Sequence, residues 1–423
     1  MPPPSGSLAR FWAALSSWRT ASISLLSFSS GLPLGMVYIA IPDWMRSTGV
    51  DLKTIGLFGL AQLPWTVKFI WSPLIDRYSL PWLDRHRGWA ALAQVALTVL
   101  TFLLSGLGNH PDAPWVVAAL ALAIAFASAT QDIAIDAYAV EVLRPDEQGI
   151  AVGARTALYR AAMYAAGAAS ITLAGWYSWP TVTKSLALLY VPLLFVTIRA
   201  PGLAGAPAAP ATLADAVIQP LKELFRRSHA FELLAFVFLF KLADNLGSAL
   251  LRPFLIDLGY SSIDRGLALG TVGLFATLTG TFLGGIVSAF LGLGHSLWIF
   301  GSLQVFSNLG YVWVAASDVN RTLMYSAMGF ESFTSGLGTG AFGVLLLRMT
   351  ERRFSATQFA LLSSLFGLNR TLAIPLAGYL ADRVGWTNFY WLTILGGVPG
   401  LLFLHRFVPL GAREPTVRPT AEG

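Results

Sequence analysis

The sequence predicts an all-α polytopic membrane protein with twelve spanning helices in two halves of six. Of its 423 residues, 55% are hydrophobic and 12% are charged, and the mean hydropathy is +0.63. A soluble domain carries about 25% charged residues, and a disordered chain combines low hydrophobicity with high net charge. The 40 Gly and 14 Trp are typical of membrane proteins, in which Trp gathers at the interfaces. The composition therefore excludes both a soluble domain and a disordered chain.

Twelve apolar stretches are long enough to cross a bilayer, for which a helix needs roughly 20 residues. Helices are expected because lipid offers no hydrogen-bond partners to open backbone groups. The predicted spans are 20–41, 54–76, 89–108, 114–139, 149–173, 179–199, 231–257, 264–291, 295–316, 319–347, 357–381 and 386–407.

One long connection separates the sixth predicted span from the seventh. It starts with a segment rich in Gly, Ala and Pro and continues with a helical pattern from Leu213 to Phe225, which we expect to be an interface helix. The predicted domains are an N-terminal six-helix half (1–199), a cytoplasmic linker with the interface helix (200–230), a C-terminal six-helix half (231–407) and a cytoplasmic tail (408–423).

The basic residues outside the spans predict the orientation of the chain. Sixteen Lys and Arg fall on the side of the two termini, and the other side holds five: Arg46, Lys53, Arg265, Arg321 and Arg383. Because Lys and Arg accumulate in cytoplasmic loops, both termini are predicted to be cytoplasmic. The same rule accounts for the net charge of +6, so nucleic acid is not an expected partner. Residues 1–19 lack the apolar core of a signal peptide.

An internal repeat supports the division into two halves. Arg160, Gly175 and Trp176 recur as Arg370, Gly385 and Trp386, with the same offset of 210 residues at each position. Parallel six-helix halves of this kind resemble the architecture of major facilitators. The resemblance implies a major facilitator fold.

Two carboxylates in the fourth predicted span are candidates for proton coupling. Asp132 and Asp136 are four residues apart and share one helix face. Two carboxylates in a region of low dielectric repel each other, so at least one is expected to bind and release a proton. Gln131 beside them is a candidate contact for a polar ligand. The alternative is that both carboxylates pair permanently with inner-side arginines such as Arg77 or Arg144 and form a gate.

Arg160 and Arg370 occupy equivalent positions in the two halves. A guanidinium group binds carboxylate or phosphate through two hydrogen bonds, so the pair predicts a site for an anionic ligand. The alternative is that they form internal ion pairs with Asp132, Asp244 or Glu331.

The second half holds two further groups of charges within its spans. Glu331 has no basic residue within four positions, so a proton or a distant cation must neutralise it, and we expect it to take part in proton coupling. Lys241 and Asp244 are three residues apart and are expected to neutralise each other.

The loop after the second predicted span carries a charge cluster. Lys68-Phe-Ile-Trp-Ser-Pro-Leu-Ile-Asp76-Arg77-Tyr78 is followed by Arg85 and Arg87. The cluster resembles the loop signature of major facilitators, in which charge pairs between helices lock one access state. We therefore expect a gating role for these charges. The corresponding loop of the second half, residues 292–296, has no such cluster, so the lock is expected to be one-sided.

Several classes of protein chemistry are excluded. The chain has no Cys and hence no disulfide or thiolate metal site. Its five His lie in or near loops and lack the spacing of a catalytic or metal site, and no Gly-x-x-x-x-Gly-Lys nucleotide loop occurs. The expected protein is a secondary carrier without metal or cofactor, and not an enzyme.

Three stretches resemble the AmpG-type muropeptide permease family. The first is Gly31-Leu-Pro through Asp51–Gly56 to Lys68–Tyr78, the second is Gln131-Asp-Ile with Asp136-Ala, and the third is Phe354–Ser364. The resemblance implies proton-driven import of N-acetylglucosaminyl-anhydro-N-acetylmuramyl peptides across the bacterial inner membrane for cell-wall recycling. It implies an anionic glycopeptide, protons and membrane lipids as partners, with no obligate protein partner.

Related families leave an alternative cargo open. The acetyl-CoA transporters share Thr130–Ala134, and the siderophore permeases share the pattern of Lys68–Tyr78. These relatives keep the architecture and change the cargo, because a fold does not determine a substrate. The alternative is therefore a siderophore or acyl-CoA carrier of the same fold.

Overall fold

The structure is a computed structural model that describes residues 16–50, 58–108, 114–202, 209–226 and 230–415. These ranges are helical nearly throughout and contain no strand. Several features used above lie outside the described residues. They are the stretch Asp51–Gly56, which belongs to the family resemblance and contains Lys53, the start of the second predicted span, and the basic residues Arg10, Arg227 and Arg418.

The first half follows the six predicted spans. Its second span is broken into short helices, and Pro64 and Pro73 stand in the first turns of two of them, where the missing N–H of proline costs nothing. The helices are α2 (Trp18–Gly35), a π-helix (Met36–Ala40) and α3 (Ile41–Ser47); η2 (Gly59–Gln62), α5 (Leu63–Val67), η3 (Lys68–Ile70) and α6 (Ser72–Arg77); α7 (Arg85–Ser105); α8 (Pro114–Val142); α9 (Gln148–Tyr164), a π-helix (Ala165–Ala169) and α10 (Ser170–Trp176); and α11 (Trp179–Arg199).

The second half repeats this pattern. Its last helix bends at Gly385, whose φ of 76° lies in the left-handed region that glycine adopts without a steric penalty, and the bend separates the two last predicted spans. The helices are α13 (Ala230–Leu239), α14 (Leu242–Ala249) and α15 (Leu251–Asp257); α16 (Ser262–Gly266), a π-helix (Leu267–Val272) and α17 (Gly273–Leu291); α18 (Leu293–Ser307) and α19 (Leu309–Ala315); α20 (Arg321–Met349); and η6 (Arg352–Phe354) with α21 (Ser355–Phe407).

Eight of the described helical stretches are long and apolar enough to cross a membrane. One of them, Arg352–Phe407, contains both the eleventh and the twelfth predicted span. The second, fifth and tenth predicted spans are helical as well, in the helices from η2 to α6, in α9 with α10, and in α20. The described helices are therefore consistent with the twelve predicted spans.

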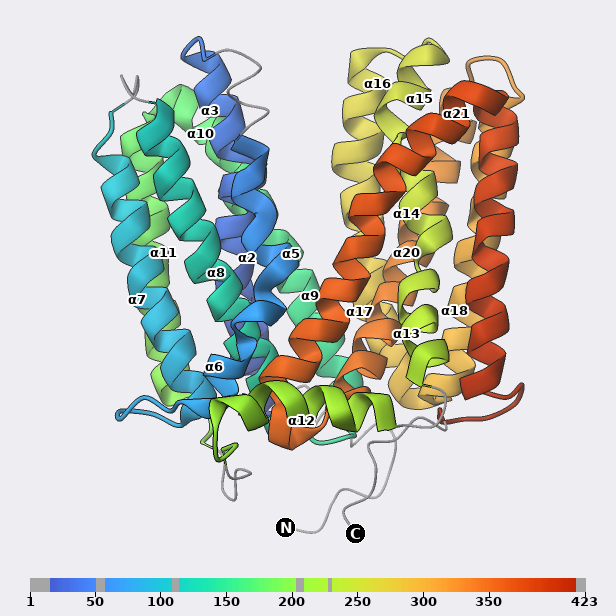
Figure 1. Ribbon diagram of the computed structural model, residues 1–423. Coiled ribbons are helices and arrows are strands. Elements are labelled where there is room, and N and C mark those ends of the chain that lie inside the picture. The colour runs from blue at the N-terminus through green and yellow to red at the C-terminus, as the bar shows by residue number, and fades with distance from the viewer. Residues whose placement is uncertain (1–15, 51–57, 109–113, 203–208, 227–229, 416–423) are drawn as a thin grey trace.

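The linker contains the predicted interface helix as α12 (Leu213–Arg226). It lies across one end of the molecule, roughly perpendicular to the spanning helices (Figure 1). Ala216, Pro220 and Leu224 are buried against the bundle, and the Pro220 carbonyl accepts a hydrogen bond of 3.4 Å from Gln358. We refer to this side of the molecule as the α12 end.

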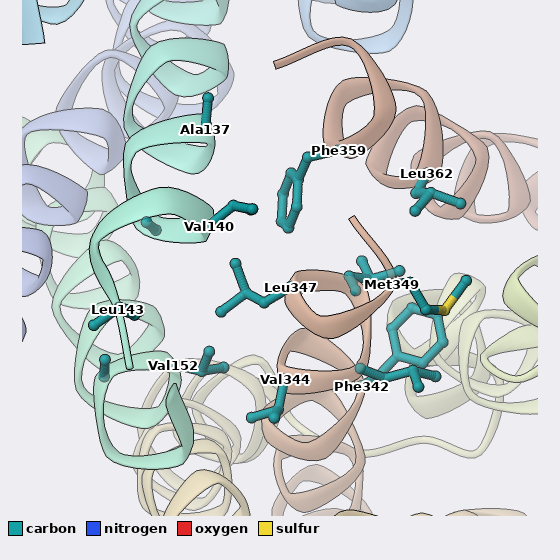
Figure 2. Packing of buried hydrophobic residues seen from close by; sticks show 14 of the residues in the cluster. Ala137, Val140, Leu143, Val152, Phe342, Val344, Leu347, Met349, Phe359 and Leu362 are labelled. Carbon is teal, nitrogen blue, oxygen red and sulfur yellow. The ribbon is translucent and has the colours of Figure 1, made fainter. Parts of the chain in front are cut away.

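The two halves meet at the α12 end and spread apart toward the other end (Figure 1). An apolar cluster joins them there, in which Val140 of α8, Leu347 of α20 and Phe359 of α21 point toward one another (Figure 2). Glycines bring α9 and α17 into backbone contact, since a Cβ on Gly285 would lie 2.2 Å from the carbonyl oxygen of Gly149. The contact therefore depends on the absence of side chains at both positions.

Candidate transport site

A cavity of about 250 Å³ lies between the two halves, next to the apolar cluster. The first half contributes most of its polar lining and the second half most of its apolar lining. The residues from the first half are Ser27, Ser30, Lys68, Asp132, Asp136, Val152, Arg155, Thr156 and Tyr159, and those from the second half are Thr339, Phe342, Gly343, Leu346, Phe359 and Phe366.

Asp136 is the centre of an ion-pair cluster in this cavity. Its Oδ1 pairs with Arg155 of α9, and its Oδ2 lies 3.5 Å from Lys68 Nζ. Arg155 also donates to Ser27 Oγ at 3.2 Å. Of the predicted alternatives, the pairing of Asp136 with cations agrees with the structure, but its partners are Lys68 and Arg155 and not the inner-loop arginines. Lys68, assigned to the gating cluster from the sequence, lies instead in the wall of the cavity.

Asp132 lines the same cavity one helical turn from Asp136. No donor among the described residues reaches its Oδ1, although this atom is shielded from solvent. A buried carboxylate oxygen without a partner costs free energy unless a ligand, a water molecule or a proton satisfies it. Asp132 is thus open to a ligand or a proton.

Arg160 and Arg370 lie on α9 and α21, and their charges are close enough to interact. Arg160 is half-buried and Arg370 is exposed. No carboxylate of the described chain lies within ion-pair distance of either guanidinium group, so the predicted ion pairs with Asp132, Asp244 or Glu331 do not form. Two unpaired guanidinium groups from opposite halves can bind an anion between them.

Gln131 lies outside the lining of this cavity. It is fully buried, and its Nε2 donates to Ser29 Oγ at 2.7 Å. Ser29 also accepts from Gln94, whose Oε1 accepts from Thr197. Gln131 Nε2 therefore helps to pack α8 against α2, whereas no donor of the described chain reaches its buried Oε1, and the ligand contact expected from the sequence stays a prediction.

The second half contains its own buried charge cluster. Lys241 Nζ lies 2.9 Å from Asp244 Oδ2, as the spacing of the two residues predicts. Ser335 Oγ donates to the same oxygen at 2.9 Å. Glu331 is 4% exposed, and its Oε2 accepts from Tyr311 Oη at 3.0 Å.

Asp76 connects the two halves at the α12 end. Its carboxylate accepts hydrogen bonds from Ala356 N (3.1 Å), Thr357 N (2.7 Å) and Thr357 Oγ1 (2.6 Å) at the start of α21. The first N–H groups of a helix have no partner within the helix and carry partial positive charge, so a buried carboxylate stabilises them. Asp76 thereby holds α6 of the first half against α21 of the second.

Glu141 at the end of α8 forms a second connection beside the first. It accepts from Ser355 Oγ at 2.8 Å, from Arg85 at 3.2 Å, and lies 3.0 Å from His86 Nδ1. Arg85 also donates to the Asp76 carbonyl oxygen at 2.9 Å. Arg85 thus contacts the Glu141 carboxylate and the backbone of Asp76, the two residues that bond to α21.

Among the described residues, the other two charges predicted for the gate form no hydrogen bond or ion pair with the second half. Arg87 pairs with Asp84 at 2.7 Å and donates to the carbonyl oxygen of Ala200, which ties α7 to the end of α11. Arg77 lies over the ring of Tyr78. Within the described chain, Asp76 and Arg85 are therefore the members of the predicted cluster that act at the contact between the halves.

Three residues of these sites received no role from the sequence. Arg155 is a charge within a span, but its partner was not evident from the sequence. Glu141 and His86 stand at helix ends, where charged residues are common, and only the fold brings them to Ser355 and Asp76.

The chain matches known transporters in sequence and in structure. The family model of the Major Facilitator Superfamily matches residues 23–352. The anhydromuropeptide permease of Escherichia coli K12 is 38% identical over 388 residues, which cover 91% of this chain and 79% of the relative. An uncharacterized protein of Haemophilus influenzae is 34% identical over 90% of this chain and 93% of its own length.

Solved structures agree with the fold. The fucose:proton symporter of E. coli superposes with a TM-score of 0.70 over 92% of this chain and 98% of the symporter, at 11% identity. The relatives of known activity are carriers, in agreement with the prediction of a transporter that is not an enzyme. The chain belongs to the Major Facilitator Superfamily and, within it, to the family of AmpG-type permeases.

Proposed function

We propose that the protein imports anhydromuropeptides by proton symport across the bacterial inner membrane. The observation that carries the proposal is the identity of 38% with the anhydromuropeptide permease of E. coli, which extends over 91% of this chain. At this coverage the similarity extends over both halves of the chain.

Two arginines outside the lining of the cavity support an anionic glycopeptide as cargo. A muropeptide carries peptide carboxylates, and Arg160 and Arg370 are unpaired guanidinium groups from opposite halves of the described chain. The sugar hydroxyl and amide groups need polar partners, which Asp132, Lys68 and Thr156 supply in the first-half wall. The apolar side of the cavity, with Phe342 and Phe359, suits the faces of the sugar rings.

Proton coupling is proposed for a carboxyl group within the spans, and the candidates are Asp132, Asp136 and Glu331. Charged groups within membrane spans are costly, and in transporters they form proton pathways. The sequence has no phosphate-binding loop for ATP, so an ion gradient is the expected source of energy.

The proposed orientation places both termini in the cytoplasm, because Lys and Arg predominate on that side. The α12 end then faces the cytoplasm, and the spread end faces the periplasm (Figure 1). In this orientation the arrangement is open to the outside, and Asp76, Arg85 and Glu141 act as the inner gate. The proposed surroundings are membrane lipids, without an obligate protein partner.

Transport by the purified full-length chain in proteoliposomes tests the function. With an inward proton gradient, labelled anhydromuropeptide is expected to accumulate, and a protonophore is expected to abolish the accumulation. Unlabelled anhydromuropeptide should compete, whereas a ferric siderophore and acetyl-CoA should not. Competition by acetyl-CoA or the siderophore in place of the muropeptide would favour the alternative cargo and contradict the proposal.

A further inference from the structure

The two buried charge clusters differ in their balance of charge. In the first half, the cations Lys68 and Arg155 accompany Asp132 and Asp136, so the four charges sum to zero when both carboxyl groups are ionised. In the second half, Lys241 is the cation of the described chain within ion-pair distance of Asp244, and Glu331 brings a second carboxyl group. That cluster carries one negative charge too many unless a proton is bound.

The hydrogen bonds of the second cluster leave a place for this proton. Asp244 Oδ2 accepts from Lys241 Nζ and Ser335 Oγ, but no N–H or O–H donor of the described chain reaches Asp244 Oδ1. The Glu331 carboxyl group lies close enough to the Asp244 carboxyl group for a shared proton to join them. Two ionised carboxylates are acceptors only, so this contact requires a proton on one of them.

The groups that surround the pair fix where the proton sits. Glu331 Oε2 faces Tyr311 of α19, and the ring of Tyr390 of α21 packs on Tyr311 at 5.0 Å between centroids. Asp244 of α14 and Lys241, the residue before α14, lie on another side of the pair, and Ser335 of α20 contacts Lys241. Lys241 and Ser335 hold Asp244 in its ionised form, so the proton belongs on Glu331.

We infer that the Glu331–Asp244 pair carries the transported proton, and that Asp132 stays an ionised residue of the ligand cavity. This inference rests on the proposed function, since it needs a proton-coupled carrier of an anionic cargo. A proton that enters binds to Glu331 and donates to Asp244 Oδ1. On release it leaves Glu331, and no other group changes its charge.

The anion site is placed to couple proton and cargo. The positive charge of Arg160 acts on Asp244 and on Arg370. An anion bound between the two guanidinium groups cancels part of this positive charge, and the second cluster then binds a proton more readily. Coupling free energies are reciprocal, so the proton also favours the anion, and the two load together as symport requires.

Proton uptake on ligand binding tests the inference directly. Purified full-length protein in weakly buffered detergent is mixed with anhydromuropeptide and a pH indicator. The wild type is expected to take up about one proton per bound ligand. Glu331→Gln should bind the ligand without proton uptake. Asp244→Asn should also lose the proton uptake, and it replaces Glu331→Gln if that variant does not fold. The matched control Asp264→Asn, whose carboxylate pairs with Arg321 outside the lining of the cavity, should retain the uptake. Uptake per bound ligand that persists in Glu331→Gln, or that is lost in Asp132→Asn but not in Glu331→Gln, would overturn the assignment.

Transport separates this inference from the proposed function. In proteoliposomes, Glu331→Gln should exchange labelled for unlabelled muropeptide at close to the wild-type rate, because exchange needs no net proton movement. It should fail to accumulate muropeptide in a proton gradient, and accumulation at the wild-type level would refute the inference. If the wild type moves no muropeptide, the proposed function fails, and the proton measurement is repeated with acetyl-CoA as the ligand. Proton uptake by the wild type but not by Glu331→Gln would still support the Glu331–Asp244 pair. Proton uptake by both proteins would refute it.

Discussion

Removing the charge of Asp76 should open the contact between the halves at the α12 end. Asp76 is fully buried and accepts three hydrogen bonds at the N-terminus of α21. A hydrogen bond to a charged group is worth about 1.5–3 kcal/mol, and a partly buried charge at a helix terminus up to about 2 kcal/mol. These contributions overlap, and Asn keeps one acceptor, so we expect Asp76→Asn to cost about 2–3 kcal/mol. Because 1.4 kcal/mol is a factor of ten, the ratio of the two access states should change roughly 30- to 150-fold.

The absence of cysteine makes this shift measurable with introduced labels. Ser47→Cys and Ile263→Cys place two exposed labels on opposite halves at the spread end, and pulsed electron resonance measures the distance between them. Wild type should show mainly long distances, and Asp76→Asn should add a population with short distances. Asp84→Asn is the matched control, since Asp84 caps α7 and pairs with Arg87 within the first half. A distance distribution that is the same in Asp76→Asn and wild type would refute the gate.

Three further outcomes are expected. Arg160→Gln and Arg370→Gln should each weaken muropeptide binding, measured by calorimetry, by about 2–5 kcal/mol, or roughly 30- to several-thousand-fold. Arg370→Lys should also bind more weakly, whereas the control Arg383→Gln should bind normally. Normal binding by both Arg160→Gln and Arg370→Gln would contradict the anion site. Gly285→Ala should disfavour the state with the α12 end closed, because its Cβ would meet the Gly149 carbonyl. Gly378→Ala, with open space around it, should leave the label distances unchanged. Equal label distances in the two variants would argue against the close contact. Arg77→Gln and Arg87→Gln should leave the access equilibrium unchanged, since neither side chain contacts the second half in the described structure, and a shift as large as that of Asp76→Asn would show that the cluster acts as a whole.

The fold class was determined by composition and by the lengths of the apolar stretches. Lipid permits few backbone solutions, so an apolar stretch of about 20 residues predicts a spanning helix almost independently of its neighbours. The linker helix was also predictable, as Leu213–Phe225 from the sequence and Leu213–Arg226 in the structure. The break in the second span was not predicted, although Pro64 and Pro73 indicate where its short helices begin.

The candidate residues were predictable as a set, because charges inside spans are rare and each one needs a reason to be there. Their partners were not predictable, since an ion pair depends on which helix faces lie together. Lys68 and Asp76 are eight residues apart in one charged stretch, yet Lys68 joins Asp136 in the cavity and Asp76 reaches the backbone of Ala356 and Thr357. The partner of Asp76 is a helix terminus, which carries partial charge without any charged side chain and so leaves no signal in the sequence.

The sequence by itself determined that this protein is a helical membrane carrier with charges in both halves. Only the tertiary structure decided that Arg160 and Arg370 lack carboxylate partners in the described chain, and that Glu331 contacts Asp244. The physical reason is that hydrophobic periodicity and span length are local properties of the chain. The balance of charge in a cluster depends instead on which distant helices pack together.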